Sequence, residues 1–135
     1  MKSVELFAKH SSPTYFYRFP YSGSINLLRL ISNLKYTGSA HTDELAYMFN
    51  VELNGINKIP LTIFDDLIRK RLLHLWTNFA KFGNPTPQAS SVVPLIWSPV
   101  KANVSDVTTL DIDFHMQMIP NPFAEKIAFW DELIE

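Results

Sequence analysis

The clearest hydrophobic pattern in the chain lies between residues 63 and 82. Apolar residues recur there at spacings of three and four, the period of one face of an α-helix. Thr62 stands before this stretch as an N-cap, with Asp65 three positions further on, and Gly83 follows it as a stop signal. The pattern predicts a helix over residues 63–82. Its apolar stripe comprises Phe64, Ile68, Leu72, Leu75, Trp76 and Phe79.

Two further helices are expected. One begins directly after His41, where apolar residues recur at helical spacing and Asp43 and Glu44 fall in the first turn. The other begins at Asn121, a capping residue, with Pro122 at the first helical position. The stripe of this second helix faces either the core or a partner, and it comprises Phe123, Ile127, Trp130 and Ile134.

Strand candidates alternate with these helices. The aromatic run 14–19, bounded by Pro13 and Pro20, predicts a strand that is covered on both faces, as in a mostly parallel sheet. Residues 95–97 and 107–112 are shorter candidates, and the type of the apolar segment 25–34 stays open. No linker divides the chain, so the prediction is one α/β domain over residues 1–135.

Composition narrows the function classes. The chain has 135 residues, with 12 Lys and Arg against 13 Asp and Glu and a formal net charge of −1. Such a balance argues against nucleic-acid binding and against a polybasic membrane anchor. A hydrophobic share of 47% supports a packed core, and no apolar segment predicts a signal peptide or a membrane span. The absence of cysteine excludes disulfides and a thiol nucleophile.

The four glycines exclude more chemistry. Gly23, Gly38, Gly55 and Gly83 are too far apart to form G-x-G-x-x-G, a P-loop or the G-x-S-x-G nucleophile elbow. The sequence therefore predicts neither a phosphate-binding loop nor a serine nucleophile within these residues.

His41 is the candidate for chemistry. None of the four histidines has metal-binding spacing, so we expect no metal site. His41 follows the small residues 38–40 and precedes a predicted helix, whose N-terminus disfavours a charged imidazole and keeps the ring ready to accept a proton. The alternative is a loop histidine that only caps or solvates the helix. Acidic residues nearby and at Asp65 and Asp66 are interpreted as partners of helix dipoles, and Asn103 begins an N-glycosylation pattern.

Three ordered segments carry a resemblance to a known family. They run from Tyr15 to Phe19, from Gly38 to Phe49 and from Leu75 to Pro85. The middle segment fits G-x-x-H-x-(D/E)-(D/E)-L-x-Y-x-F, and the last fits W-x-x-F-A-x-x-G-N-P. Together with shorter matches near residues 97, 109 and 129, they resemble the C-terminal part of type-B carboxylesterases. This α/β-hydrolase family includes insect esterases, juvenile hormone esterases and cholinesterases.

The resemblance implies an activity and a fold. It makes His41 the general base of a serine–histidine–acid triad in a carboxylic ester hydrolase that forms an acyl-enzyme and needs no cofactor. Glu44 takes a supporting role beside the histidine, buried near the active site, and is not the triad acid. The implied fold is the C-terminal part of an α/β-hydrolase domain, with its last strands and packing helices. The implied substrate is a small-molecule carboxylic ester.

The departure from the family pattern concerns what precedes His41. In the family the serine and the acid come before the histidine, whereas here only 40 residues do and none forms an elbow. We therefore expect a C-terminal fragment that is inactive and poorly stable alone, which a sharp cooperative melt would contradict. The alternative is a non-catalytic adhesion protein of the same family. The resemblance also allows a homodimer through residues 121–134 and either a secreted or a cytoplasmic location.

Overall fold

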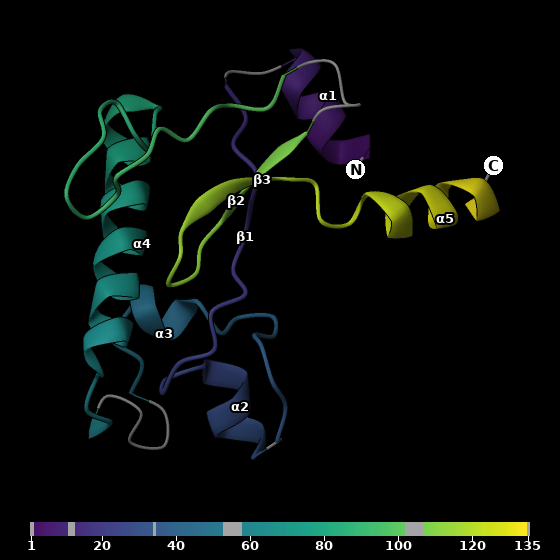
Figure 1. Ribbon diagram of the computed structural model, residues 1–135. Coiled ribbons are helices and arrows are strands. Elements are labelled where there is room, and N and C mark those ends of the chain that lie inside the picture. Colours follow the sequence, from purple (N-terminus) through teal and green to yellow (C-terminus); the bar gives the residue numbers. More distant parts are fainter. Residues whose placement is uncertain (1, 11–12, 34, 53–57, 102–106, 135) are drawn as a thin grey trace. The chain divides into compact units, whose positions relative to one another are not determined.

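The computed structural model describes residues 2–10, 13–33, 35–52, 58–101 and 107–134, and Figure 1 shows its helices and strands. Its residues group into two compact units. One comprises residues 1–18, 97–111 and 117–135, and the other residues 19–96 and 112–116. The elements in chain order are α1 (Lys2–His10), β1 (Tyr17–Arg18), α2 (Leu27–Ser32), α3 (Leu45–Met48), α4 (Ile63–Phe82), β2 (Thr108–Asp111), β3 (Gln117–Pro120) and α5 (Ala124–Ile134).

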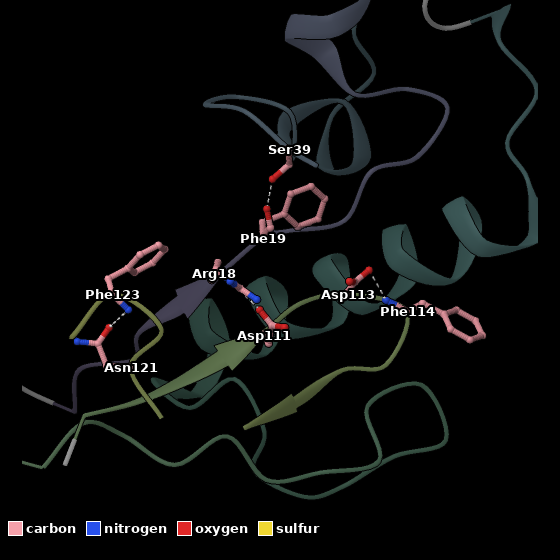
Figure 2. Close-up of polar contacts among 8 residues, drawn as sticks. All are labelled: Arg18, Phe19, Ser39, Asp111, Asp113, Phe114, Asn121 and Phe123. Atoms are coloured by element: carbon pink, nitrogen blue, oxygen red, sulfur yellow. Dashed lines mark hydrogen bonds and ion pairs between the residues drawn. The ribbon is translucent and has the colours of Figure 1, made fainter. Parts of the chain in front are cut away.

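The first unit contains a three-stranded sheet in the order β1-β2-β3 (Figure 1). β1 runs parallel to β2, with Tyr17 opposite Leu110, and β2 runs antiparallel to β3. Arg18 Nε donates to Asp111 Oδ1 at 2.7 Å and joins the two parallel strands (Figure 2). The predicted strand 14–19 is thus real but reduced to two residues, and the sheet is mixed because β3, which the pattern did not predict, adds an antiparallel edge.

The predicted strand at residues 95–97 is wrong. This segment is irregular in the structure, and of its three apolar residues only Trp97, which is 4% exposed, is buried. Its ring meets those of Tyr15 and Tyr17 edge to face, with centroids 5.4 and 6.1 Å away. Prolines lack the amide proton that a strand ladder needs, and Pro94 and Pro99 flank the segment closely.

α5 begins at Ala124, two residues later than Pro122, the first helical position that the sequence predicts. Asn121 does cap, but its Oδ1 accepts the Phe123 amide at 3.0 Å in a turn that precedes the helix (Figure 2). Of the predicted stripe, Phe123 is 37% and Trp130 59% exposed, whereas Ile127 is half-buried. α1, at the other end of this unit's sequence, was not predicted.

In the second unit, α4 matches its prediction at both ends. Thr62 Oγ1 accepts the Asp65 amide at 3.1 Å, and Asp65 Oδ2 accepts the Thr62 amide at 3.0 Å, which completes a capping box. Gly83 ends the helix at φ 64°, a left-handed conformation that costs glycine little. None of the described helices is both long and apolar enough to cross a membrane.

The fully buried part of the apolar stripe of α4 is shorter than predicted. Ile68, Leu72 and Leu75 are fully buried, but Phe64 and Phe79, at the two ends of the predicted stripe, are 48% and 49% exposed. These three residues are therefore the fully buried apolar contribution of α4 to this unit's core, and the aromatic residues at the two ends of the stripe are half-exposed.

A buried guanidinium on α4 fixes a neighbouring loop. Arg71 donates to the carbonyl oxygens of Asp113 and Phe114 at 2.9 and 2.8 Å, and through Nε to that of Val92 at 3.2 Å. Burial lowers the pKa of this guanidinium. The sequence pattern did not distinguish Arg71 from the exposed basic residues beside it.

Candidate functional site

His41 lies in a tight turn that precedes α3. The Asp43 amide donates to the Ala40 carbonyl oxygen at 3.2 Å, so residues 40–43 form a β-turn with His41 at its second position. The His41 side chain is exposed, and none of the described residues makes a hydrogen bond to its ring. An accessible imidazole on a defined turn can exchange a proton with a group brought to it.

Thr42, the next residue of this turn, has an unusual backbone conformation. Its φ is 76°, which type II turns require at their third position and which glycine normally supplies. A β-branched residue is strained there, at a cost of about 1–3 kcal/mol. The turn that carries His41 must therefore be held by contacts elsewhere.

Asp43 supplies these contacts. Its carboxylate is fully buried and accepts four hydrogen bonds. Oδ2 receives the Ala40 amide at 2.8 Å, inside the turn, and the Tyr36 hydroxyl at 2.9 Å. Oδ1 receives the Leu28 amide at 2.7 Å, in the first turn of α2. One side chain thus ties the His41 turn to α2 and to the segment before the turn.

The fourth donor to Asp43 is Asn26, which is also fully buried. Asn26 Nδ2 lies 3.0 Å from Asp43 Oδ2 and 3.1 Å from the Tyr21 carbonyl oxygen. Its Oδ1 accepts the Gly23 amide at 2.8 Å and lies 3.0 Å from the Tyr47 hydroxyl. Both ends of the amide are satisfied, which fixes its orientation.

Asp65 lies at the other end of the same network. The Tyr47 hydroxyl is 3.3 Å from Asp65 Oδ1, so its one proton is shared between Asp65 and Asn26. The Tyr21 hydroxyl, at 3.1 Å, and both the amide and hydroxyl of Ser24, at 3.1 and 2.7 Å, also donate to this buried carboxylate. Together with its capping box, Asp65 joins the start of α4 to the network.

Gly23 lies where the network is tightest. A Cβ placed on it would overlap Asp65 Oδ1, the Tyr47 hydroxyl and the Tyr21 ring. Glycine is required at this position for space, because every larger residue would push apart groups that now exchange hydrogen bonds.

The network fixes the protonation of its members. Burial alone would raise the pKa of Asp65, but hydrogen bonds from Thr62 and Ser24 outweigh it and lower that pKa to about 2. Burial also opposes ionisation of Asp43, and the amide of Ala40 and the Asn26 side chain hold its pKa below the ordinary value. Burial and the Asp65 charge raise the pKa of Tyr21 to about 12 and that of Tyr47 further.

The other predicted site residues are placed as follows. Glu44 is half-buried at the N-cap of α3, and its side chain makes no capping hydrogen bond. The fully buried acid after the histidine is Asp43, one residue earlier than the resemblance implies. Asn103 lies outside the described residues. Among the residues that the structure describes, no three acidic or histidine side chains group as metal ligands.

The pattern missed Asp43 and Asp65 because first-turn acids are usually explained by the helix dipole. Asp66 fits that explanation, since it forms an exposed ion pair with Lys70 at 2.6 Å. The spacing of Asp65 from Thr62 predicted the cap of the helix, in which the acid turns back towards the preceding chain, but it did not show that the carboxylate is buried.

Comparisons with known proteins cover almost the whole chain. The family model described as "Carboxylesterase family" matches residues 1–130. Human neuroligin-2 is 30% identical over 146 residues, covering 98% of this chain, and esterase FE4 of Myzus persicae is 31% identical over 107 residues, covering 74%. The chain spans 17% of the length of each of these relatives.

Juvenile hormone esterase from Manduca sexta, solved with OTFP covalently attached, shares the fold. It superposes with a TM-score of 0.73 at 25% identity, over 98% of this chain and 26% of the esterase chain. The described helices and strands therefore form part of an α/β-hydrolase fold, as the resemblance implied. Neither the sequence nor the structure supplies a nucleophile elbow to His41 within these residues. The ordered motifs, the family match and this shared fold together place the chain in the carboxylesterase family.

Proposed function

We propose that His41 is the general base of a carboxylic ester hydrolase. The observation that carries this proposal is the exposed imidazole on a strained turn, which the buried carboxylate of Asp43 holds in place. A solvated loop histidine would need no such support. Membership of the carboxylesterase family favours the same role.

The chemistry follows from what a neutral imidazole can do. His41 takes the proton of a serine hydroxyl as the serine oxygen attacks the ester carbon, and returns it to the leaving alcohol. A water molecule, activated in the same way, then hydrolyses the acyl-serine. The serine, its oxyanion donors and the triad acid are not among the motifs of these 135 residues. The proposed activity therefore belongs to a protein in which they accompany this segment, and Glu44 supports the histidine there.

The native polypeptide, meaning the gene product that carries residues 1–135, provides the test. Its mass is measured first, with an antibody against residues 123–135. A band several times heavier than 15.5 kDa means that the polypeptide is long enough to include a serine nucleophile and a triad acid, and the activity assay below then tests whether they act with His41. A band at 15.5 kDa overturns the triad proposal for this chain and leaves a binding role.

The activity test compares His41→Gln with the unchanged native polypeptide. General acid–base catalysis contributes about 10²–10⁴-fold, so kcat for a short-chain nitrophenyl ester should fall by at least that factor. Covalent labelling by OTFP, the group attached to the Manduca sexta esterase, should fall in parallel. His10→Gln, another exposed histidine, is the control and should leave both readouts unchanged. Full activity in His41→Gln would refute the proposal.

The second candidate is a non-catalytic binding protein of the same family. The matches to neuroligins favour it. It predicts that the native polypeptide contains no serine elbow and that OTFP does not label it. Under this alternative, His41→Gln and His10→Gln behave alike in every assay.

A further inference from the structure

Two fully buried carboxylates, one just before α3 and one in the first turn of α4, belong to one hydrogen-bonded network. Asp43 and Asp65 are each 0% exposed, and Asn26 and Tyr47 connect them. Every described donor to either carboxylate is neutral: amides, hydroxyls and one side-chain amide. Among the described residues the ion pairs are Arg18–Asp111 and Lys70–Asp66, so neither buried carboxylate has a described cation.

Burying a charge without a counter-charge is costly unless hydrogen bonds compensate for it. A hydrophobic residue would cover the same space more cheaply if packing were the only need. The feature that Asp43 alone can provide is geometric, because its two oxygens reach the Ala40 amide inside the His41 turn and the Leu28 amide of α2 at the same time.

We propose that Asp43 is a positioning residue for His41. It holds the strained turn 40–43 closed, and Asn26, Tyr47 and Asp65 hold Asp43 in turn. This inference rests on the proposed function and deepens it: His41 donates and accepts the proton, while Asp43 touches neither substrate nor the reacting atoms. Its effect is to keep the imidazole in one place, which reduces the reorganisation that each proton transfer requires.

The charge of Asp43 matters as well as its shape. Oδ2 accepts from Ala40, Tyr36 and Asn26, while Oδ1 accepts from Leu28. In Asp43→Asn, either orientation of the amide sets an NH₂ group against at least one of these donors. The variant keeps the volume of the side chain but loses at least one of the hydrogen bonds that hold the turn.

The test measures kcat, KM and melting temperature of the native polypeptide carrying Asp43→Asn. At a temperature well below melting, we expect kcat to fall by about tenfold or more with KM changed by less than about twofold, since the loss is confined to the chemical step. Asp66→Asn is the matched control, because it makes the same replacement at an exposed ion pair on α4. A structural role alone would lower the melting temperature and leave kcat per folded molecule unchanged, and this result overturns the proposal.

A milder variant covers the case in which Asp43→Asn does not fold. Tyr36→Phe removes one donor to Oδ2 and keeps the carboxylate. A fall in kcat at constant KM then supports the proposal, and an unchanged kcat contradicts it. The two proposals fail separately: full activity in His41→Gln removes the proposed function, whereas an inactive His41→Gln beside a fully active Asp43→Asn removes only the positioning role.

Hydrogen–deuterium exchange gives a readout that needs no activity. Peptides containing the Ala40 and Leu28 amides should exchange faster in Asp43→Asn than in Asp66→Asn, because both amides donate to Asp43. Equal exchange in the two variants would show that Asp43 does not hold the turn, whatever the polypeptide catalyses.

Discussion

α4 and α5 look alike in sequence and differ in the structure. Both have an apolar stripe with aromatic residues and a capping residue before the first turn. α4 buries Ile68, Leu72 and Leu75 completely, while α5 leaves Trp130 and Leu133 59% and 62% exposed. Helical periodicity thus predicts a helix and one of its faces, but whether that face is covered depends on the segments that fold against it.

The two helices also differ in how they begin. The cap of α4 includes Asp65, whose carboxylate extends into the buried network around Asn26 and Tyr47. The cap before α5 is Asn121, whose side chain accepts one local amide in an exposed turn. A cap that also forms hydrogen bonds to residues distant in sequence links a helix to the candidate site around His41, and a local cap does not.

Leu72→Ala on α4 should give the largest effect. Truncating a fully buried leucine leaves a cavity and lowers the free energy of unfolding by about 2–5 kcal/mol. Leu73→Ala makes the same truncation one position along, where the side chain is 38% exposed, and should cost much less. Denaturant unfolding of the native polypeptide measures both. Equal losses would mean that α4 buries a wider face than the structure describes.

Gly23→Ala should come next, because its Cβ overlaps Asp65, Tyr47 and Tyr21. Overpacking of this kind lowers the free energy of unfolding by about 1–3 kcal/mol. Gly23→Ser, which adds one further atom, should be at least as destabilising in the same unfolding experiment. A neutral Gly23→Ala would contradict the close packing at the start of α4.

The loss of folding stability at low pH should depend on Asp65. Its pKa falls from 3.8 to about 2 on folding, so its stabilising contribution is complete above about pH 4 and is lost as the pH falls towards 2. Melting temperatures of the native polypeptide between pH 5 and 2 should therefore fall less steeply in Asp65→Asn. Asp66→Asn should keep the slope of the unchanged protein. Parallel slopes in all three proteins would show that Asp65 is not the group that titrates.

Trp130→Ala on α5 should give the smallest effect. Substituting an exposed residue outside a hydrogen-bonded network changes the free energy of unfolding by no more than about 0.5 kcal/mol, which the same unfolding assay measures. A loss of about 3–5 kcal/mol would show that this face is covered in the native polypeptide, and the contrast between the two helices would then disappear.

Local signals were sufficient for several elements. The bounds of α4, its capping box and its terminal glycine followed from Thr62, Asp65 and Gly83, because helix ends depend on residues within one turn. A short helix after His41 is also present, as α3, but it begins at Leu45, so Asp43 and Glu44 precede it instead of lying in its first turn. β3 and the truncation of β1 did not follow from local signals, since strand limits depend on which partner each backbone meets.

Of the candidate site, only His41 could be predicted from the sequence, and the residues that support its turn could not. The motif around residues 38–49 identified His41 and, through the resemblance, the family to which the chain belongs. The network that supports it joins Asn26, Asp43 and Asp65 across separations of 17 and more positions. No periodic pattern encodes such contacts, so Asp43 and Asp65 looked like ordinary first-turn acids.

The sequence by itself determined both ends of α4, the candidate loop around His41, and the family, since each depends on residues close together in the chain. Only the tertiary structure decided which carboxylates are buried, which helix face is covered, and why Gly23 has no side chain. These features arise from long-range contacts, whose free energy depends on which groups exclude water together. His41 is therefore a candidate because of its neighbours in sequence, whereas the hydrogen bonds that hold its turn come from its neighbours in space.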